Sequence, residues 1–92
     1  MTKADIVTDI SHKTGLDRAA VLTIVEKLME VVKDSMAGGN NVYLRGFGSF
    51  VIKTRKEKTA RNISKNTAIK IPEHNIPAFK PSKVFMDLVK DN

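Results

Sequence analysis

The sequence predicts an α+β fold, in which a helical hairpin is followed by a three-stranded antiparallel sheet with a long protruding β-ribbon arm and by a short C-terminal helix. Three observations predict it. Apolar residues recur at spacings of three and four within residues 1–39, which indicates two helices with one buried side each. Residues 41–81 are apolar at both ends and basic in the middle, about residues 53–70, which indicates a buried base and a solvated arm. Residues 83–90 return to helical spacing.

The helical body, residues 1–39, has clear start and stop signals. Thr2 can cap the first helix with Asp5 closing a capping box, and Gly15 ends it. Asp17 can cap the second helix, which stops at Gly38 and would be roughly 30 Å long, comparable to the width of a small domain. We therefore expect a hairpin of one short and one long helix.

The sheet and arm, residues 41–81, begin with a short strand over residues 41–44. Gly46 and Gly48 then give the backbone freedom for a turn. Two long strands follow, joined at a tip near residues 61–66. Pro72 and Pro77 cannot donate ladder hydrogen bonds, so the returning strand lies at a sheet edge or carries a bulge that bends the arm. Ser82 can cap the last helix, residues 83–90.

A second copy of the chain is expected to complete the core. The 92 residues form one domain, 1–92, and a chain of this size has a thin margin of stability. Two helices cannot cover both faces of a sheet that also carries Phe47, Phe50 and Phe79, and an isolated ribbon is marginal in water. These phenylalanines are therefore predicted to lie in a core shared by two chains. A compact monomer with a loose arm is the alternative.

The charge is unevenly distributed along the chain. The formal net charge is +6, yet residues 1–44 carry five Lys and Arg against six Asp and Glu, while residues 45–92 carry eleven against four. A basic half beside a near-neutral half predicts a polyanionic partner, and nucleic acid is the commonest one in cells. The chain has no cysteine for a disulfide or thiolate site, and it shows neither a signal peptide nor an apolar run of bilayer length. We expect a cytoplasmic protein with no membrane partner.

A set of residues along the whole chain carries a family resemblance. The set is Asn41, Val42, Leu44, Gly46, Phe47, Gly48, Phe50, Arg61, Asn62, Ile69, Ile71, Pro72, Pro77, Phe79, Lys80, Pro81 and Lys83. At this spacing it resembles the bacterial HU and integration host factor family of histone-like, architectural DNA-binding proteins. The resemblance implies an intertwined dimer whose two β-arms wrap double-stranded DNA in the minor groove and bend it, a binding mode for which this family is itself a standard example.

The arm tip departs from the family pattern. The family carries Arg-Asn-Pro followed shortly by Thr-Gly, and its proline wedges between base pairs. Here Ile63 stands in the place of the proline and Asn66 in that of the glycine. Isoleucine is also known as a wedge, and Asn tolerates a left-handed turn. Ile63 is therefore expected to intercalate; the alternative is an exposed side chain on a mobile tip.

The arm cations are the main candidates for DNA phosphate contacts. They are Lys53, Arg55, Lys56, Lys58, Arg61, Lys65 and Lys70. Glu57 is the one acid among these seven bases, whereas a merely solvated face would mix signs more often. The alternative is that they keep the strand soluble and block edge pairing. Arg61 and Asn62 are the expected minor-groove readers.

Three further lysines could hold phosphates on the body. Lys80 and Lys83 lie beside the amino end of the last helix, and Lys3 lies in the first turn of the first helix. For Lys3 a purely solvated role is an equal alternative.

The apparent catalytic and metal-binding motifs lack residues that such sites require. The Gly46-Phe47-Gly48 turn lacks the third glycine and the following helix of a nucleotide-binding loop. His12 and His74 have no ligand partners at metal spacing, and no nucleophile stands near a base. We expect no cofactor, no metal and no enzymatic activity.

The predicted function is DNA bending largely without sequence specificity, which compacts the nucleoid. Two alternatives stay open. One is a sequence-selective subunit of a heterodimer like integration host factor, rather than a homodimer. The other is a basic interaction module for RNA or acidic proteins, although four Phe, one Tyr and no Trp disfavour single-strand stacking platforms.

Overall fold

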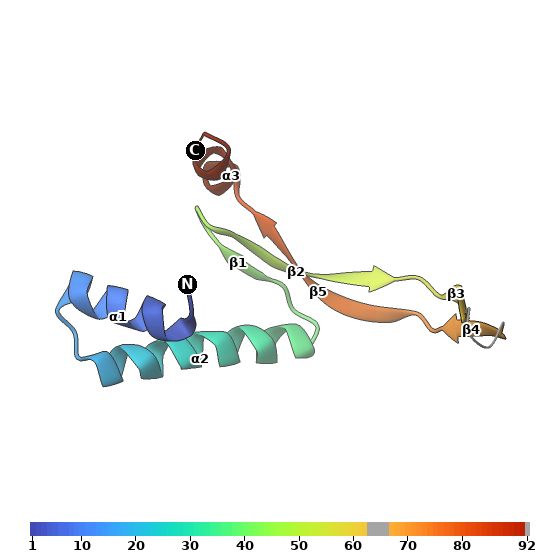
Figure 1. The fold of residues 1–92 in the computed structure, drawn as a ribbon, viewed down its shortest axis with the longest axis horizontal. Helices are drawn as coiled ribbons and strands as arrows, with labels where there is room; N and C mark the ends of the chain where they lie inside the picture. Colours follow the sequence, from blue (N-terminus) through green and yellow to red (C-terminus); the bar gives the residue numbers. More distant parts are fainter. Residues whose placement is uncertain (63–66, 92) are drawn as a thin grey trace. The chain divides into compact units, whose positions relative to one another are not determined.

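The computed structural model describes residues 1–62 and 67–91, in which helices and strands follow the predicted order (Figure 1). The chain divides into two compact units, Met1–Ser35 and Met36–Asn92, and each is described by itself. The single domain expected for residues 1–92 stays a prediction.

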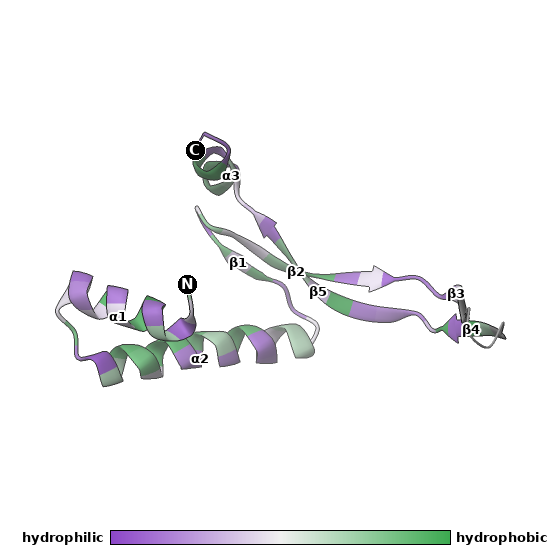
Figure 2. Cartoon of the chain, viewed as in Figure 1, coloured by the Kyte–Doolittle hydropathy of each residue, from purple (hydrophilic) through white to green (hydrophobic). Residues whose placement is uncertain are grey.

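The first unit is the predicted helical hairpin. It contains α1 (Lys3–Thr14) and the greater part of α2 (Arg18–Ala37). The capping box at the start of α1 is confirmed, since Thr2 N donates to Asp5 Oδ2 at 2.9 Å and Asp5 N donates to Thr2 Oγ1 at 3.3 Å. Gly15 ends α1 in the left-handed conformation at φ 74°. Polar and apolar residues alternate along both helices (Figure 2), and Val7 and Val21 are fully buried.

The second unit contains the predicted three-stranded antiparallel sheet. Its strands are β1 (Val42–Leu44), β2 (Gly48–Arg55) and β5 (His74–Pro81), in the order β1-β2-β5. The returning strand β5, which contains Pro77, lies at the edge as expected. The last helix, α3 (Lys83–Lys90), is capped by Ser82, whose Oγ accepts a hydrogen bond from Phe85 N at 3.1 Å.

The predicted ribbon is divided into two ladders. A separate two-stranded sheet of β3 (Lys58–Asn62) and β4 (Thr67–Ile71) continues the arm beyond β2 and β5. Pairing is interrupted at residues 56–57 on the outgoing chain and at residues 72–73 on the returning chain. Pro72 lies at this interruption and has no N–H to donate, which accounts for the break. The two long strands predicted for the arm are therefore each divided in two, at the place where Pro72 indicated an irregularity.

Phenylalanine side chains pack together in the second unit. The ring centroids of Phe47 and Phe79 are 5.2 Å apart, and those of Phe50 and Phe79 are 5.0 Å apart. Phe85 of α3 joins them, stacked on Phe47 with the centroids 5.3 Å apart. The three predicted phenylalanines therefore do meet, and a fourth from the last helix completes the group. Their place in a core between two chains stays a prediction.

The two glycines of the turn have different roles. Gly46 adopts φ 81°, so it supplies the conformational freedom that the sequence suggested. Gly48 has no positive φ and is buried. A Cβ at residue 48 would lie 2.6 Å from the Lys80 carbonyl oxygen and 2.6 Å from the Phe79 ring. The expectation that Gly48 supplies backbone freedom for the turn is wrong. Position 48 requires glycine because there is no room for a side chain.

Candidate nucleic-acid interface

The strand register separates cationic from apolar side chains on the sheet β1-β2-β5. Directly paired residues of antiparallel strands project from the same face, and the projection alternates along each strand. One face therefore carries four successive rows. They are Tyr43, Ser49 and Lys80, then Val51 and Ala78, then Lys53 and Ile76, then Arg55 and His74.

The opposite face is apolar at the end of the sheet nearest α3. Phe50 pairs with both Val42 and Phe79, and Ile52 pairs with Pro77. Predicted core residues and predicted phosphate ligands on this sheet thus lie on opposite faces. We call the first face, with Lys53, Arg55 and Lys80, the cationic face.

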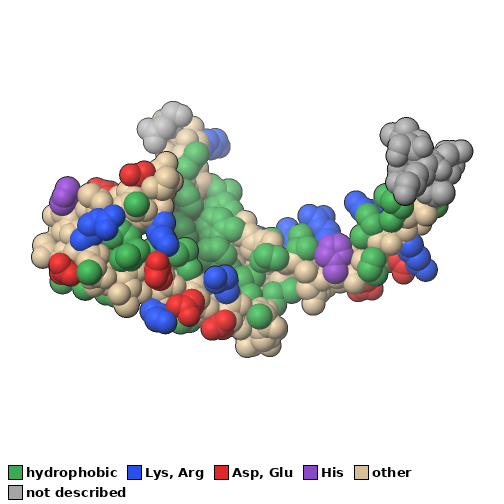
Figure 3. Space-filling view, turned by 60° about the horizontal axis from the view of Figure 1, so that its bottom comes forward, with side chains coloured by type: hydrophobic (Ala, Val, Ile, Leu, Met, Phe, Trp, Pro, Cys, Tyr) green, Lys and Arg blue, Asp and Glu red, His purple; other side chains and the backbone are tan. Residues whose placement is uncertain are grey.

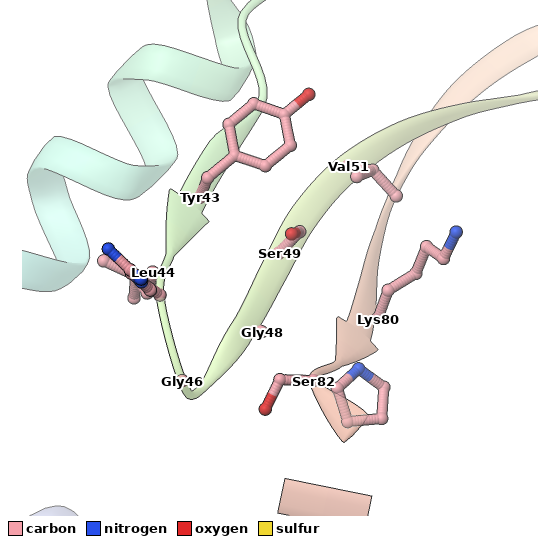
Figure 4. Close-up of a pocket in the computed structure, with 10 residues that line it drawn as sticks. Tyr43, Leu44, Gly46, Gly48, Ser49, Val51, Lys80 and Ser82 are labelled. Atoms are coloured by element: carbon pink, nitrogen blue, oxygen red, sulfur yellow. The ribbon is translucent and has the colours of Figure 1, made fainter. Parts of the chain in front are cut away.

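A shallow pocket of about 510 Å³ lies where the cationic face meets the turn before β2. Tyr43, Ser49, Val51 and Lys80 project around it from β1, β2 and β5 (Figure 4). Arg45 also lines it. Sequence reasoning did not assign Arg45 to the site, although its place directly before the Gly46 turn was the available signal.

A second pocket, of about 440 Å³, lies at the interruption between the two ladders. Its lining residues are Arg55, Lys56, Lys58, Ile71, His74 and Ile76. The space-filling view shows Lys and Arg (blue) with a histidine (purple) gathered over this strand region (Figure 3). Three predicted phosphate ligands therefore line one pocket with His74, which sequence reasoning had dismissed only as a metal ligand.

The remaining candidate cations differ in their ionic partners. Lys3 Nζ lies 2.9 Å from Glu26 Oε1, Lys70 Nζ lies 2.9 Å from Glu57 Oε1, and Lys83 Nζ lies 3.1 Å from Asp87 Oδ2. These three lysines must exchange a carboxylate for a phosphate if they contact DNA. Exposed pairs of this kind contribute about 0–1 kcal/mol, so the exchange costs little.

The other predicted cations have no such competitor. Within residues 1–62 and 67–91, no carboxylate lies within salt-bridge distance of the following side chains: Lys53, Arg55, Lys56, Lys58 and Lys80. All five are exposed. They are therefore free to meet an anionic partner.

The predicted arm tip is described only in part. Arg61 and Asn62 belong to β3, where they pair with Ala68 and Thr67. Ile63 and Lys65 lie outside the described residues. The roles expected for these four residues stay predictions.

Other kinds of site find no support in the part of the chain that the structure describes. Across residues 1–62 and 67–91, no three His, Asp or Glu side chains are grouped so that they could hold a metal ion. Among the described helices, none is both long and apolar enough to cross a membrane.

Comparison with known proteins gives a consistent result. Residues 1–90 match the protein family described as bacterial DNA-binding protein. The DNA-binding protein HU of Thermus thermophilus is 40% identical over 98% of this chain and 93% of its own length. An integration host factor subunit alpha of Anaeromyxobacter is 31% identical over 91% of this chain and 85% of its own length.

Solved structures give the same result. An Anabaena HU protein crystallised with DNA superposes with a TM-score of 0.94 at 28% identity, with full coverage of both chains.

Proposed function

Because this chain belongs to the HU and integration host factor family of bacterial DNA-binding proteins, we propose that it wraps and bends double-stranded DNA largely without sequence preference. One observation carries the proposal beyond family membership. The register of β2 and β5 places Lys53, Arg55 and Lys80 on one face, while Phe50 and Phe79 occupy the other. A surface of this kind can bind a polyanion on one side while the other side stays packed against apolar groups.

The length of the cationic face suits a duplex. Lys80 and His74 are six residues apart in β5, a distance of about 20 Å at ~3.4 Å per residue. Successive base pairs are also ~3.4 Å apart, so the face can follow about six of them. Cations without acidic partners release counterions from DNA phosphates when they bind, which supplies affinity independent of sequence. We assign phosphate contact first to Lys53, Arg55, Lys56, Lys58 and Lys80, and next to Lys3, Lys70 and Lys83.

The arm tip supplies the bend in this proposal. Arg61 and Asn62 enter the minor groove, Lys65 holds a flanking phosphate, and Ile63 separates two stacked bases. Unstacking costs a few kcal/mol per step, and contacts along the wrapped duplex offset it.

A second copy of this chain completes the molecule. On α2, Ile24, Leu28 and Val31 are 60%, 51% and 64% exposed, and their spacing places them along one stripe. In the second unit, Phe47 and Phe79 are still 46% and 38% exposed. We propose that these apolar groups are covered in a homodimer, which then carries two arms and acts at the nucleoid.

The decisive experiment measures bending and affinity separately. A short duplex with a donor and an acceptor dye at its ends reports bending by energy transfer, and fluorescence anisotropy reports affinity. We expect log affinity to fall with log salt concentration with a slope of about −0.9 per phosphate neutralised. A slope near zero would remove the cationic face from the mechanism.

Variants at the tip test the wedge. Ile63→Ala should lose bending while it keeps most of its affinity. Ile69→Ala makes the same chemical change within β4 and should bend DNA normally. Unchanged bending by Ile63→Ala would assign the wedge to another residue. A fixed-sequence duplex bound much more tightly than random duplexes would favour a sequence-selective subunit, and equal binding of RNA would favour a general polyanion module.

A further inference from the structure

His74 lies at the point where the cationic face meets the interruption of the arm. It is the first residue of β5 and pairs with Arg55, the last residue of β2. It therefore projects from the face that carries Lys53 and Lys80. His74 also lines the 440 Å³ pocket with Arg55, Lys56 and Lys58. A titratable side chain thus stands among three permanent cations.

The hydrogen bond of the imidazole fixes which nitrogen is available. His74 Nδ1 lies 3.0 Å from the carbonyl oxygen of Pro72. A carbonyl oxygen can only accept, so Nδ1 carries the proton and donates it. In the neutral ring Nε2 is then an acceptor, and it becomes a donor only when it gains a proton. Nε2 is therefore the atom through which His74 would bind an anion.

The charges around His74 suit the pocket to an anionic ligand. Arg55 at the end of β2, Lys56 in the connection and Lys58 at the start of β3 are positive, so the pocket that they line with His74 attracts an anion. Of the nearby acids, Glu57 is paired with Lys70, and Glu73 precedes His74 in the other connection. A phosphate bound in the pocket would lie close to all four basic groups and would favour the protonated form of His74.

We propose that His74, with Arg55, Lys56 and Lys58, forms a proton-linked site for a DNA phosphate at the base of the arm. The inference rests on the proposed function, since the phosphate belongs to the wrapped duplex. In the complex, Nε2–H donates to a phosphate oxygen while Nδ1–H holds the ring to Pro72. The protein takes up one proton at this site when it binds DNA, so DNA affinity depends on pH.

The direction of this dependence follows from linkage. The phosphate stabilises the protonated imidazole, so the additional affinity is present at acidic pH. It is lost as the pH rises and the bound imidazole loses its proton. One pKa unit corresponds to a tenfold change in affinity, and for an exposed histidine we expect a gain of about three- to tenfold between about pH 8 and about pH 5.5.

The test is a pH series of duplex affinity by fluorescence anisotropy, at constant ionic strength and in a buffer free of phosphate. The full chain is compared with His74→Gln, which is neutral at every pH, and with His74→Lys, which is always charged. His12→Gln is the matched control, because the sequence contains only these two histidines.

The expected pattern is specific. His74→Gln should bind as the unmodified chain does at about pH 8 and should gain little on acidification. His74→Lys should have the high affinity already at about pH 8, and His12→Gln should behave as the unmodified chain. A pH dependence that survives in His74→Gln or disappears in His12→Gln would overturn the inference. A flat profile of the unmodified chain with tight binding would also overturn it and leave the proposed function standing, whereas absence of duplex binding at every pH would overturn the proposed function itself.

Discussion

Gly48 is the position where strand pairing and aromatic packing meet. The Lys80 carbonyl oxygen and the Phe79 ring both lie 2.6 Å from the point where a Cβ would stand. Backbone on one side and a packed ring on the other leave little room for adjustment. We expect Gly48→Ala to lower the free energy of unfolding by about 1–3 kcal/mol, the usual cost of overpacking.

Thermal unfolding followed by circular dichroism measures this change. Ser49→Ala is a suitable control, because residue 49 is the next residue in β2 and projects from the other face. It should unfold close to the unmodified protein. A Gly48→Ala protein as stable as Ser49→Ala would show that β5 can move away from β2 at no cost.

Asp5 gives the start of α1 a dependence on pH. The Thr2 backbone N–H, and after it the Thr2 side chain, lower the pKa of Asp5 below its ordinary value of 3.8. The stabilisation is therefore present above the ordinary value and is lost as the pH falls through the lowered pKa of the folded state. We expect Asp5→Asn to have a lower melting temperature at neutral pH and to match the unmodified protein near about pH 2.

Asp9→Asn makes the same chemical change further along α1, where the carboxylate pairs with Lys13 at 3.3 Å. An exposed pair within a helix contributes only about 0.3–0.5 kcal/mol, so its loss should be smaller. Equal melting temperatures of Asp5→Asn and the unmodified protein at neutral pH would contradict the prediction.

For single residues, the sequence predicts the features that depend only on neighbouring positions in the chain. The capping box at Thr2, the end of α1 at Gly15 and the cap at Ser82 all involve residues within a few positions of one another, so spacing was sufficient. The spatial role of Gly48 depends on a ring about thirty residues further along. Nothing in the glycine pattern indicates that contact.

One candidate cation of the arm is held in an ion pair with an acid of the same arm. Glu57 lies in the outgoing connection and Lys70 in β4, and their side chains pair across the interruption at 2.9 Å. Glu57→Gln removes this competitor and leaves Lys70 free for a phosphate. Because an exposed pair is worth up to about 1 kcal/mol, we expect duplex affinity to rise by up to about fivefold. The salt slope should steepen by about 0.9 if Lys70 gains one phosphate contact.

Glu73→Gln removes the same charge from the opposite connection and separates a specific effect from a general one. At about pH 8 it should raise affinity less and leave the salt slope unchanged. Equal gains from the two substitutions would show that net charge alone, and not the release of Lys70, strengthens binding.

For the arm, the sequence pattern predicts some features and misses others. Pro72 predicted an irregularity in the returning strand, and the interruption lies there. In the sequence Glu57 is one acid among seven bases, and only the folded arm brings its side chain to that of Lys70. His74 was missed for the same reason, because its cationic neighbours Arg55, Lys56 and Lys58 lie 16 to 19 residues earlier in the chain and meet it only through strand pairing.

For the whole molecule, the exposed apolar surface is the feature that a single chain leaves unexplained. Contiguous exposed apolar groups mark association sites in soluble proteins. Sequence reasoning anticipated this surface from the number of large apolar residues and the small size of the domain. It could not anticipate which of them one chain buries by itself, as it does with Val7 and Val21.

Association should therefore couple to stability. We expect the purified chain to sediment at twice its monomer mass and its melting temperature to rise with protein concentration, because unfolding then separates two chains. Leu28→Glu places a charge in the stripe on α2, where Leu28 is 51% exposed, and should shift the protein toward monomer and lower the melting temperature. Thr23→Glu places the same charge on α2 four residues before Lys27, a spacing that favours the pair, and should leave the dimer intact. A melting temperature independent of concentration, together with monomer mass for the unmodified chain, would mean that one chain is the folding unit, and the two-armed grip on DNA would then have to come from two independent molecules.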